Sequence, residues 1–388
     1  MKYNFDEEIG RRGTNSIKWD FTDKFLGAKD VLPMWVADMD FKAPAPVINA
    51  IKRRAKHGIY GYTGRSESYY DAIINWMKIR HNWEINRNWL TDSPGVVAGL
   101  SIAILTFTKP GDKIVIQPPV YTPFFDIIRE NGRQIVVNEL KLQNGRYVMD
   151  FNDLKSKIDS RTKMLILCSP HNPVGRVWTE DELNELGKIC AKNDIIILSD
   201  EIHSDIIYDD YRHFPIASIS EEIAEETITF IAPSKTFNIA GLLNSAVIIP
   251  NKKLYDDFEN IKYALGMHLG NTFGIEATEA CYKYGEEWLE QLICYLEENL
   301  SYMKDYFDRN LPKIKVIVPE GTYLVWLDFR ETGYSADKIN TLLKERARIG
   351  LNDGRVYGPG GKGFERINIG CPRSMLKEGL ERIKSVFG

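Results

Sequence analysis

Short runs of aliphatic and β-branched residues recur along the middle of this 388-residue chain. Such runs, without alternating polar positions, are typical of strands that are buried on both faces of a sheet. Helical stretches separate some of them, and one of these stretches begins at Thr179, which forms a capping-box pattern with Glu182. The runs are residues 114–117, 164–167, 195–198, 227–231 and 246–249. The alternation predicts an α/β fold, a three-layer α/β/α domain with a mostly parallel sheet.

The pattern changes near residue 286, which indicates a second and smaller domain. A long charged helical region at residues 286–310 leads to shorter strand-like runs and a terminal helix. These runs are residues 314–318, 323–328 and 366–369. We therefore expect a large domain at residues 46–286 and a smaller α+β domain formed by residues 1–45 and 287–388.

Composition and charge exclude several classes of function. The formal net charge is −4, and no cluster of Lys and Arg suggests binding to nucleic acid. No apolar run approaches the roughly 20 residues of a membrane helix, and the N-terminus lacks the apolar core of a signal peptide, so we expect a cytoplasmic protein. The five cysteines are scattered without C-x-x-C spacing, which argues against a disulfide framework and against a metal site.

Lys235 stands directly after the apolar run at residues 227–231. A buried ammonium group without a partner costs several kcal/mol, so a lysine at the end of a buried strand requires a reason to be there. Lysines in surface loops are common, and the position of Lys235 alone does not exclude that alternative. The neighbouring strand ends decide between the two interpretations.

Polar residues follow three of the predicted strands. Asn172 lies in the turn after residues 164–167, Asp200 follows residues 195–198, and Lys235 follows residues 227–231. In open α/β sheets, ligands bind at the carboxyl ends of the strands. We therefore expect these three side chains to meet at one edge of the sheet.

These residue types match the requirements of pyridoxal 5′-phosphate. The cofactor needs a lysine to bond to its aldehyde and a carboxylate to keep its pyridine nitrogen protonated, roles that suit Lys235 and Asp200. An amide such as that of Asn172 can donate to the phenolate oxygen, and a ring such as that of Tyr121 can stack on the pyridine. Each residue also has an ordinary structural alternative, a solvated strand end, a turn or a packed ring, but their order and placement together favour the site.

Two further features suit the phosphate and an amino-acid substrate. Residues 93–100 read as a turn that enters a helix, so the N–H groups of Val96 and Val97 can bind a phosphate, with the hydroxyl of Ser234 nearby. Arg366, at the edge of a predicted strand in the smaller domain, can grip an α-carboxylate with two parallel hydrogen bonds. Most arginines are surface groups, so Arg366 by itself is a weak signal.

The chain resembles the fold-type I pyridoxal-phosphate enzymes of the class I/II aminotransferase superfamily. The landmarks are Asn172-Pro-Val-Gly175, Asp200-Glu201-Ile-His203, Ser234-Lys235 and Arg366. Within that superfamily it is most similar to the cystathionine β-lyase branch, and the similarity covers nearly the whole chain. The stretches that carry it are residues 32–41, 60–64, 119–124, 169–178, 232–241 and 366–373.

Two positions depart from typical aminotransferases. His203 stands where those enzymes often have a tyrosine, and Leu243 stands where they commonly have an arginine that binds the phosphate. Both departures match the lyase branch. They favour elimination over transamination, and the absence of that arginine leaves fewer residues that can be assigned to the phosphate.

The resemblance assigns roles to specific residues. Lys235 would hold the cofactor and act as the catalytic base, and Tyr62 would reach the phosphate from the neighbouring subunit, which implies a homodimer with shared active sites. Arg366, Asn172 and Ala37 would bind the substrate. The other residues assigned to the cofactor are Asp200, Asn172, Tyr121, His203, Val96, Val97 and Ser234.

The implied activity is a pyridoxal-phosphate-dependent carbon–sulfur β-lyase. Such an enzyme converts L-cystathionine or an S-substituted cysteine to a thiol, pyruvate and ammonia by α,β-elimination. An aminotransferase that uses the same residues is an alternative. So are a regulatory protein that binds a transcription activator, which one member of this branch exemplifies, and a scaffold that merely retains the lysine.

Overall fold

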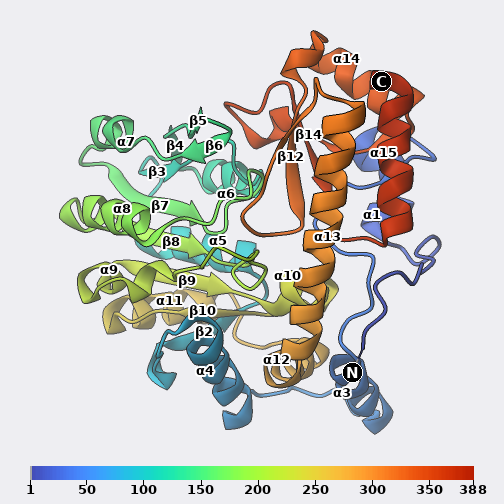
Figure 1. The fold of residues 1–388 in the computed structure, drawn as a ribbon. Coiled ribbons are helices and arrows are strands. Elements are labelled where there is room, and N and C mark those ends of the chain that lie inside the picture. Colours follow the sequence, from blue (N-terminus) through green and yellow to red (C-terminus); the bar gives the residue numbers. More distant parts are fainter. Residues whose placement is uncertain (1) are drawn as a thin grey trace.

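A seven-stranded sheet forms the centre of the larger domain in the computed structural model, which describes residues 2–388 (Figure 1). The order of its strands is β2-β10-β9-β8-β7-β3-β4. Only β10 runs antiparallel to its neighbours in this described sheet. The strands are β2 (Leu90–Ser93), β3 (Lys113–Ile116), β4 (Gln134–Val137), β7 (Thr162–Cys168), β8 (Ile196–Asp200), β9 (Thr227–Ile231) and β10 (Ser245–Ile248). The prediction of a mostly parallel sheet is confirmed.

Helices cover both faces of this sheet. The side chains of Ile114 and Ile116 pack on one face with α5 (Val96–Phe107), α6 (Pro123–Glu130) and α11 (Lys252–Ala264). The side chain of Val115, between them, packs on the opposite face with α7 (Phe151–Lys157), α8 (Glu180–Lys192) and α9 (Glu221–Glu225). This alternation follows from the two-residue period of a strand, and it confirms the three layers. The capping box of Thr179 and Glu182 at the start of α8 is also confirmed.

Three more helices pack beyond β2 and β10: α3 (Ala45–His57), α4 (Glu67–His81) and α12 (Thr272–Tyr284). Two short helices, α1 (Ile17–Asp20) and α2 (Thr22–Leu26), lie in the N-terminal segment, and α10 (Pro233–Thr236) follows β9. Strands β5 (Lys141–Gln143) and β6 (Arg146–Val148) form a separate hairpin. Among the described helices, none is long and apolar enough to cross a membrane.

The smaller domain contains a four-stranded antiparallel sheet of order β11-β12-β15-β14. Its strands are β11 (Lys315–Ile317), β12 (Leu324–Asp328), β14 (Asn352–Asp353) and β15 (Phe364–Asn368). Helices α13 (Glu286–Asn310), α14 (Ala336–Thr341) and α15 (Arg373–Phe387) accompany it, and α13 runs along the side of the molecule from α12 to this domain (Figure 1). The proposed boundary near residue 286 falls at the start of α13, and the bounds of the two domains remain a proposal.

The N-terminal segment joins the smaller domain, because β1 (Leu32–Pro33) pairs in parallel with β13 (Ile349–Gly350). Its following residues, 34–41, then lie beside β15, where the N–H of Asp40 donates to the carbonyl of Gly370. This arrangement brings residues from the start and the end of the chain next to the carboxyl ends of β7, β8 and β9.

All five cysteines are free thiols. Four of them are buried, as expected for packing residues, but Cys294 is exposed on α13 and does not pack in the core. Its position on the outer face of a long amphipathic helix accounts for the difference.

Candidate active site

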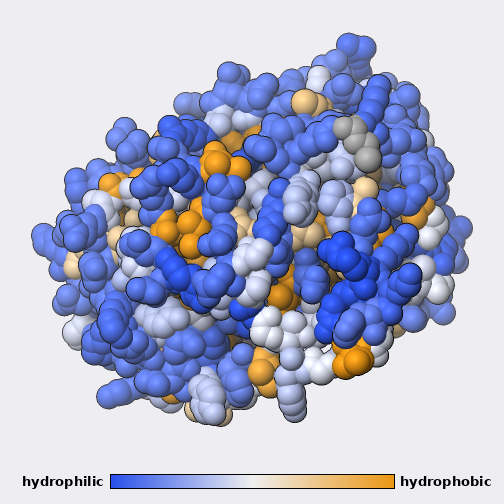
Figure 2. Space-filling view, turned by 90° about the horizontal axis from the view of Figure 1, so that it is seen from below, coloured by the Kyte–Doolittle hydropathy of each residue, from blue (hydrophilic) through white to orange (hydrophobic). Residues whose placement is uncertain are grey.

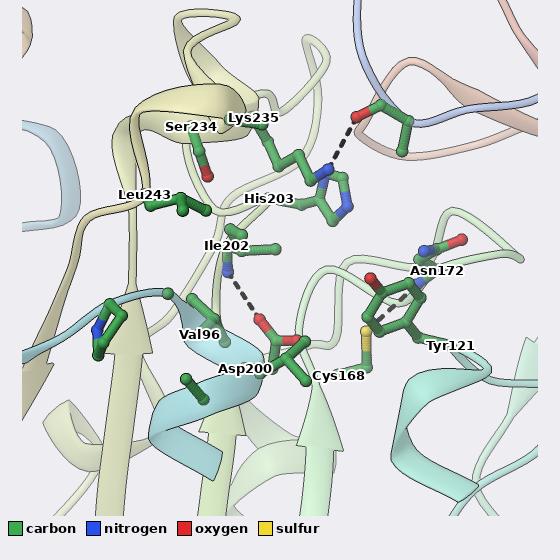
Figure 3. A pocket seen from close by; sticks show the side chains of 16 residues that line it. Val96, Tyr121, Cys168, Asn172, Asp200, Ile202, His203, Ser234, Lys235 and Leu243 are labelled. Atoms are coloured by element: carbon green, nitrogen blue, oxygen red, sulfur yellow. Dashed lines mark hydrogen bonds between the residues drawn. The ribbon is translucent and has the colours of Figure 1, made fainter. Parts of the chain in front are cut away.

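A cavity of about 390 Å³ lies at the carboxyl ends of β7, β8 and β9 (Figure 3). Its walls come from the starts of α5 and α10, from the loops that follow the three strands, and from Ala37 of the N-terminal segment. The expected residues that line it are Ala37, Val96, Val97, Tyr121, Asn172, Asp200, His203, Ser234 and Lys235. The topology thus brings together nine of the eleven expected site residues.

Asp200 is the last residue of β8, and its buried carboxylate points into the cavity (Figure 3). The carboxylate accepts a hydrogen bond from the N–H of Ile202 at 3.2 Å and forms no ion pair with a described residue. Burial raises the pKa of Asp200 to about 7. A positively charged N–H group from a ligand would compensate this buried carboxylate.

Lys235 lies in α10, the short helix that follows β9, and its half-buried side chain crosses the cavity. Its Nζ donates to the carbonyl oxygen of Ala37 at 2.8 Å (Figure 3). Burial lowers the pKa of Lys235 to about 8, and the nearby charge of Arg366 contributes, while Asp38 and Asp200 oppose the shift. The lowered pKa increases the neutral fraction of this amine, the form that can act as nucleophile or base.

The N-terminus of α5 provides a place for an anion. The helix begins at Val96 after the extended Gly95, and no side chain caps it, so the N–H groups of its first turn are available to a ligand. Val96 and Val97 line the cavity, and so does Ser234, whose hydroxyl forms no hydrogen bond to a described residue. The free N–H groups at the start of this twelve-residue helix suit a phosphate.

Tyr121 and His203 lie on the walls around the space between Asp200 and Lys235 (Figure 3). The ring of Tyr121 packs edge-on against Phe124. His203 is buried with its Nδ1 unpaired, and burial lowers its pKa to about 3, with further lowering by the positive charges of Lys235 and Arg366. The imidazole is therefore neutral, and its unpaired nitrogen can hydrogen-bond to a ligand.

These features fit pyridoxal 5′-phosphate. A buried carboxylate without a cation matches a protonated ring nitrogen, an amine of lowered pKa matches an aldehyde, and the start of α5 matches a phosphate. The unpaired Nδ1 of His203 adds a polar atom that is available to a ligand. Among the described residues, no group of three or more His, Cys, Asp or Glu side chains could hold a metal ion.

Arg366 lies next to the cavity, behind Asn172, rather than on its wall. Its Nη1 donates to Oδ1 of Asn172 at 2.9 Å, and its Nη2 donates to Trp35 O at 2.6 Å and to Oδ1 of Asn352 at 2.7 Å. The sequence predicted that Arg366 lies at the edge of a strand, and the structure corrects this. Strand β15 begins two residues earlier, at Phe364, so Arg366 lies in its middle and pairs with Asn352 and Trp326 on either side.

Tyr62 does not line the cavity of its own chain, and the residue is 93% exposed. The role expected for it concerns the site of a second subunit. The high exposure is in keeping with a residue that acts on a partner, and the role remains a proposal.

Two residues at the site were not singled out by sequence reasoning. Cys168 ends β7 and lines the cavity, where its Sγ accepts from the N–H of Asn172 at 3.4 Å. Tyr323 donates from its hydroxyl to the carbonyl of Ala37 at 3.0 Å. Both stood inside or beside apolar runs that predict strands, and no local pattern separates them from packing residues.

Comparison with known proteins identifies the family. Residues 29–383 match the family described as aminotransferase class I and II. The chain therefore belongs to the class I and II aminotransferase family, in agreement with the resemblance seen in the sequence.

Individual relatives cover the whole chain. Cystathionine β-lyase PatB of Bacillus subtilis is 45% identical over 99% of this chain and 100% of its own length. Protein MalY of Escherichia coli is 31% identical over 97% of both chains. These relatives place the chain near the cystathionine β-lyases, as the sequence motifs predicted.

Solved structures agree with the fold. A putative aminotransferase from Clostridium difficile with bound pyridoxal phosphate is 48% identical, covers 100% of both chains and has a TM-score of 0.98. Cystalysin from Treponema denticola, which contains a pyridoxal 5′-phosphate cofactor, is 41% identical over 100% of this chain and 99% of its own, with a TM-score of 0.96. The predicted fold class is confirmed.

Proposed function

We propose that this chain is a pyridoxal-phosphate-dependent carbon–sulfur β-lyase. It cleaves L-cystathionine or an S-substituted cysteine to a thiol, pyruvate and ammonia by α,β-elimination. The observation that carries the proposal is the placement of Asp200 and Lys235 on the walls of one cavity whose third wall is the start of α5. The full-length similarity to cystathionine β-lyase PatB supports the choice of reaction.

Different residues would hold different parts of the cofactor. Asp200 would pair with the ring nitrogen, Asn172 and His203 would contact the polar edge of the ring, and Tyr121 would stack on its face. Lys235 would bond to the aldehyde carbon. Val96, Val97 and Ser234 would bind the phosphate. When bound, the cofactor withdraws electron density from the α-carbon of the substrate.

The substrate is positioned by residues from the smaller domain and the N-terminal segment. Arg366 would bind the α-carboxylate with its guanidinium, next to Asn172. The backbone of Ala37 would also contact the substrate. The free Nζ of Lys235 then takes the proton from the α-carbon. The pKa of Lys235, lowered to about 8, keeps part of this amine neutral near pH 7. The thiolate would then leave the β-carbon and take up a proton, and water would hydrolyse the released enamine to pyruvate and ammonia.

An aminotransferase is the second candidate, because the similar structure from Clostridium difficile is described as a putative aminotransferase. The two activities differ in what they require. Elimination releases pyruvate from L-cystathionine without a second substrate, whereas transamination needs an α-keto acid as acceptor. Incubation of the purified protein with the cofactor and L-cystathionine, with and without an added α-keto acid, tests the proposal. A strict requirement for the acceptor would contradict it.

The active form is proposed to be a cytoplasmic homodimer with shared active sites. Exposed apolar side chains stand just before Tyr62 in the sequence, at Ile59 and Tyr60, and at the end of α11 and in the loop after it, at Tyr263, Leu265 and Leu269. Figure 2 views the molecule from the end that carries α3 and α12, and it shows hydrophobic patches among hydrophilic side chains. Such patches are a common feature of subunit interfaces. A cofactor site completed by Tyr62 from a second subunit would account for that residue's exposure.

A further inference from the structure

Two donors from different domains meet on one backbone oxygen at the cavity. The carbonyl of Ala37 accepts from Nζ of Lys235 at 2.8 Å and from the hydroxyl of Tyr323 at 3.0 Å. Tyr323 is fully buried and immediately precedes β12. A carbonyl oxygen has two lone pairs, so it can accept both hydrogen bonds at once.

The backbone on both sides of Ala37 is held by Asn368 of β15. The amide Nδ2 of Asn368 donates to the carbonyls of Val36 and Asp38, each at 2.6 Å. The N–H of Asn368 also donates to the carbonyl of Met34 at 2.9 Å. With both neighbouring carbonyls bound to Asn368, the Ala37 carbonyl is left to face Lys235 and Tyr323.

A second amide connects this segment to the turn that carries the lysine. Asn238, three residues after Lys235, accepts from the N–H of Met39 at 2.9 Å and donates to the carbonyl of the same residue at 2.8 Å. Arg11 holds the carboxylate of Asp38 with two hydrogen bonds, of 2.9 and 2.8 Å. The distance between the Ala37 carbonyl and Lys235 is therefore set by contacts on both sides.

This inference rests on the proposed function. We propose that the Ala37 carbonyl is the fixed acceptor for the Lys235 amine whenever that amine is not bonded to the cofactor, and that Tyr323 is a positioning residue which holds the same carbonyl throughout. A neutral amine that donates one N–H to Ala37 keeps its lone pair free for the proton of the substrate. When the amine leaves, the hydroxyl of Tyr323 remains, so the carbonyl is not left without a partner.

Several charged or titratable groups face Lys235 from the surrounding elements. They are Asp38 of the N-terminal segment, Asp200 of β8, His203 after β8, Arg366 of β15 and Tyr323 before β12. Of these, only Tyr323 donates to the same acceptor as Lys235, the Ala37 carbonyl. The substitution Tyr323→Phe therefore removes one of the two donors to this carbonyl without changing any formal charge.

The test measures the pKa of Lys235 directly in the full-length chain. The protein is freed of cofactor, labelled with acetic anhydride over a series of pH values, and the acetylation of Lys235 is quantified by mass spectrometry. In Tyr323→Phe the two bonds from Asn368 still hold the segment, and the Ala37 carbonyl serves the amine alone. This favours the ammonium form, so the pKa should rise by about half a unit. In Asn368→Ala the hydrogen bonds that hold the segment around Ala37 are lost, so the Ala37 carbonyl can move away from the amine. The pKa of Lys235 should therefore fall.

The control is Tyr147→Phe, which removes another buried hydroxyl, the acceptor for Trp326 Nε1 on the hairpin strand β6, and Tyr147 has no contact with Ala37 or Lys235 among the described residues. It should leave the labelling of Lys235 unchanged. After reloading with cofactor, the acid limb of the kcat profile should shift in the same direction as the labelling pKa in each variant. This second readout links the contact to the step in which the amine acts as base.

Opposite shifts in the two variants support the proposal, and so does the expected shift in one of them if circular dichroism shows that the other is unfolded. An unchanged pKa in the folded variants, a shift of the same sign in both, or an equal shift in Tyr147→Phe overturns it. The labelling requires neither cofactor nor turnover. It can therefore fail in a protein that releases pyruvate, and succeed in one that does not, which separates this proposal from that of the lyase activity.

Discussion

Arg366 donates a hydrogen bond from Nη1 to Oδ1 of Asn172 at 2.9 Å, although the two residues are 194 positions apart in the sequence. Both side chains are buried. The bond connects β15 of the smaller domain to the loop that follows β7 in the larger one. The group proposed to bind the substrate is thus held directly against a residue proposed to bind the cofactor.

Replacement of Arg366 by lysine should weaken substrate binding. Lysine keeps the positive charge but lacks the planar fork that binds a carboxylate through two hydrogen bonds. We expect kcat/KM for L-cystathionine to fall about 100-fold, which corresponds to about 3 kcal/mol. Steady-state kinetics of Arg366→Lys check this, with Arg309→Lys on the exposed face of α13 as the control. Equal kcat/KM in the two variants would refute the assigned role.

The raised pKa of Asp200 predicts a pH dependence of stability in the cofactor-free protein. A carboxyl group whose pKa is about 7 in the folded chain and about 4 in the unfolded chain binds its proton more tightly when folded. Its stabilising contribution is full below about pH 4 and is lost as the pH rises through about 7. Relative to Asp200→Asn, the free energy of unfolding of the natural protein should therefore decrease across this range, by at most about 4 kcal/mol.

Urea unfolding of the two proteins at several pH values measures this difference. The comparison between them cancels the titration of the other groups. A difference that does not change between pH 4 and pH 7 would show that Asp200 is not a buried, uncompensated carboxylate.

A buried hydrogen bond should hold the turn that carries Lys235. The hydroxyl of Thr236 donates to Oδ2 of Asp205 at 2.7 Å, and the same carboxylate lies 2.9 Å from the ring of His81 and 2.9 Å from that of Trp76. Thr236→Val should lower the free energy of unfolding by about 1–3 kcal/mol, because it leaves this acceptor short of a donor. Thr236→Ser keeps the hydroxyl and should recover most of the loss. Equal unfolding midpoints for the Val and Ser variants would contradict this expectation.

Shared active sites predict complementation between two inactive variants. Lys235→Ala lacks the base, and Tyr62→Ala lacks the residue expected to act on the partner's cofactor. In a mixed dimer, one of the two sites contains both natural residues. Subunit exchange should therefore restore about a quarter of the natural activity when mixing is random. Mixed dimers that form but remain inactive would show that each site is built from one chain.

The sequence predicted the sheet and most of the cavity because both depend on local patterns. Apolar runs mark buried strands, and the rule that ligands bind at the carboxyl ends of parallel strands brought Asn172, Asp200 and Lys235 together. The roles of Tyr323 and of the Ala37 carbonyl could not be predicted in this way. They depend on how the smaller domain and the N-terminal segment pack against the larger domain, and a backbone carbonyl leaves no mark in the sequence.

Arg366 shows the same limit in another form. Its use in carboxylate binding was expected from the chemistry of guanidinium, but its position in the middle of β15 and its bond to Asn352 are set by strand pairing. Register between strands depends on packing across the whole sheet, which short motifs do not specify. The role proposed for Tyr62 likewise concerns a second subunit, which a single chain does not contain.

The most direct test of the account is the stoichiometry of products formed from L-cystathionine by the protein loaded with pyridoxal phosphate. We predict equal amounts of thiol, pyruvate and ammonia without an α-keto acid, and a loss of turnover of at least about 1,000-fold in Lys235→Ala. Retained turnover in Lys235→Ala, or the absence of pyruvate from the natural protein, would contradict the central claim that Lys235 is the base of a carbon–sulfur lyase.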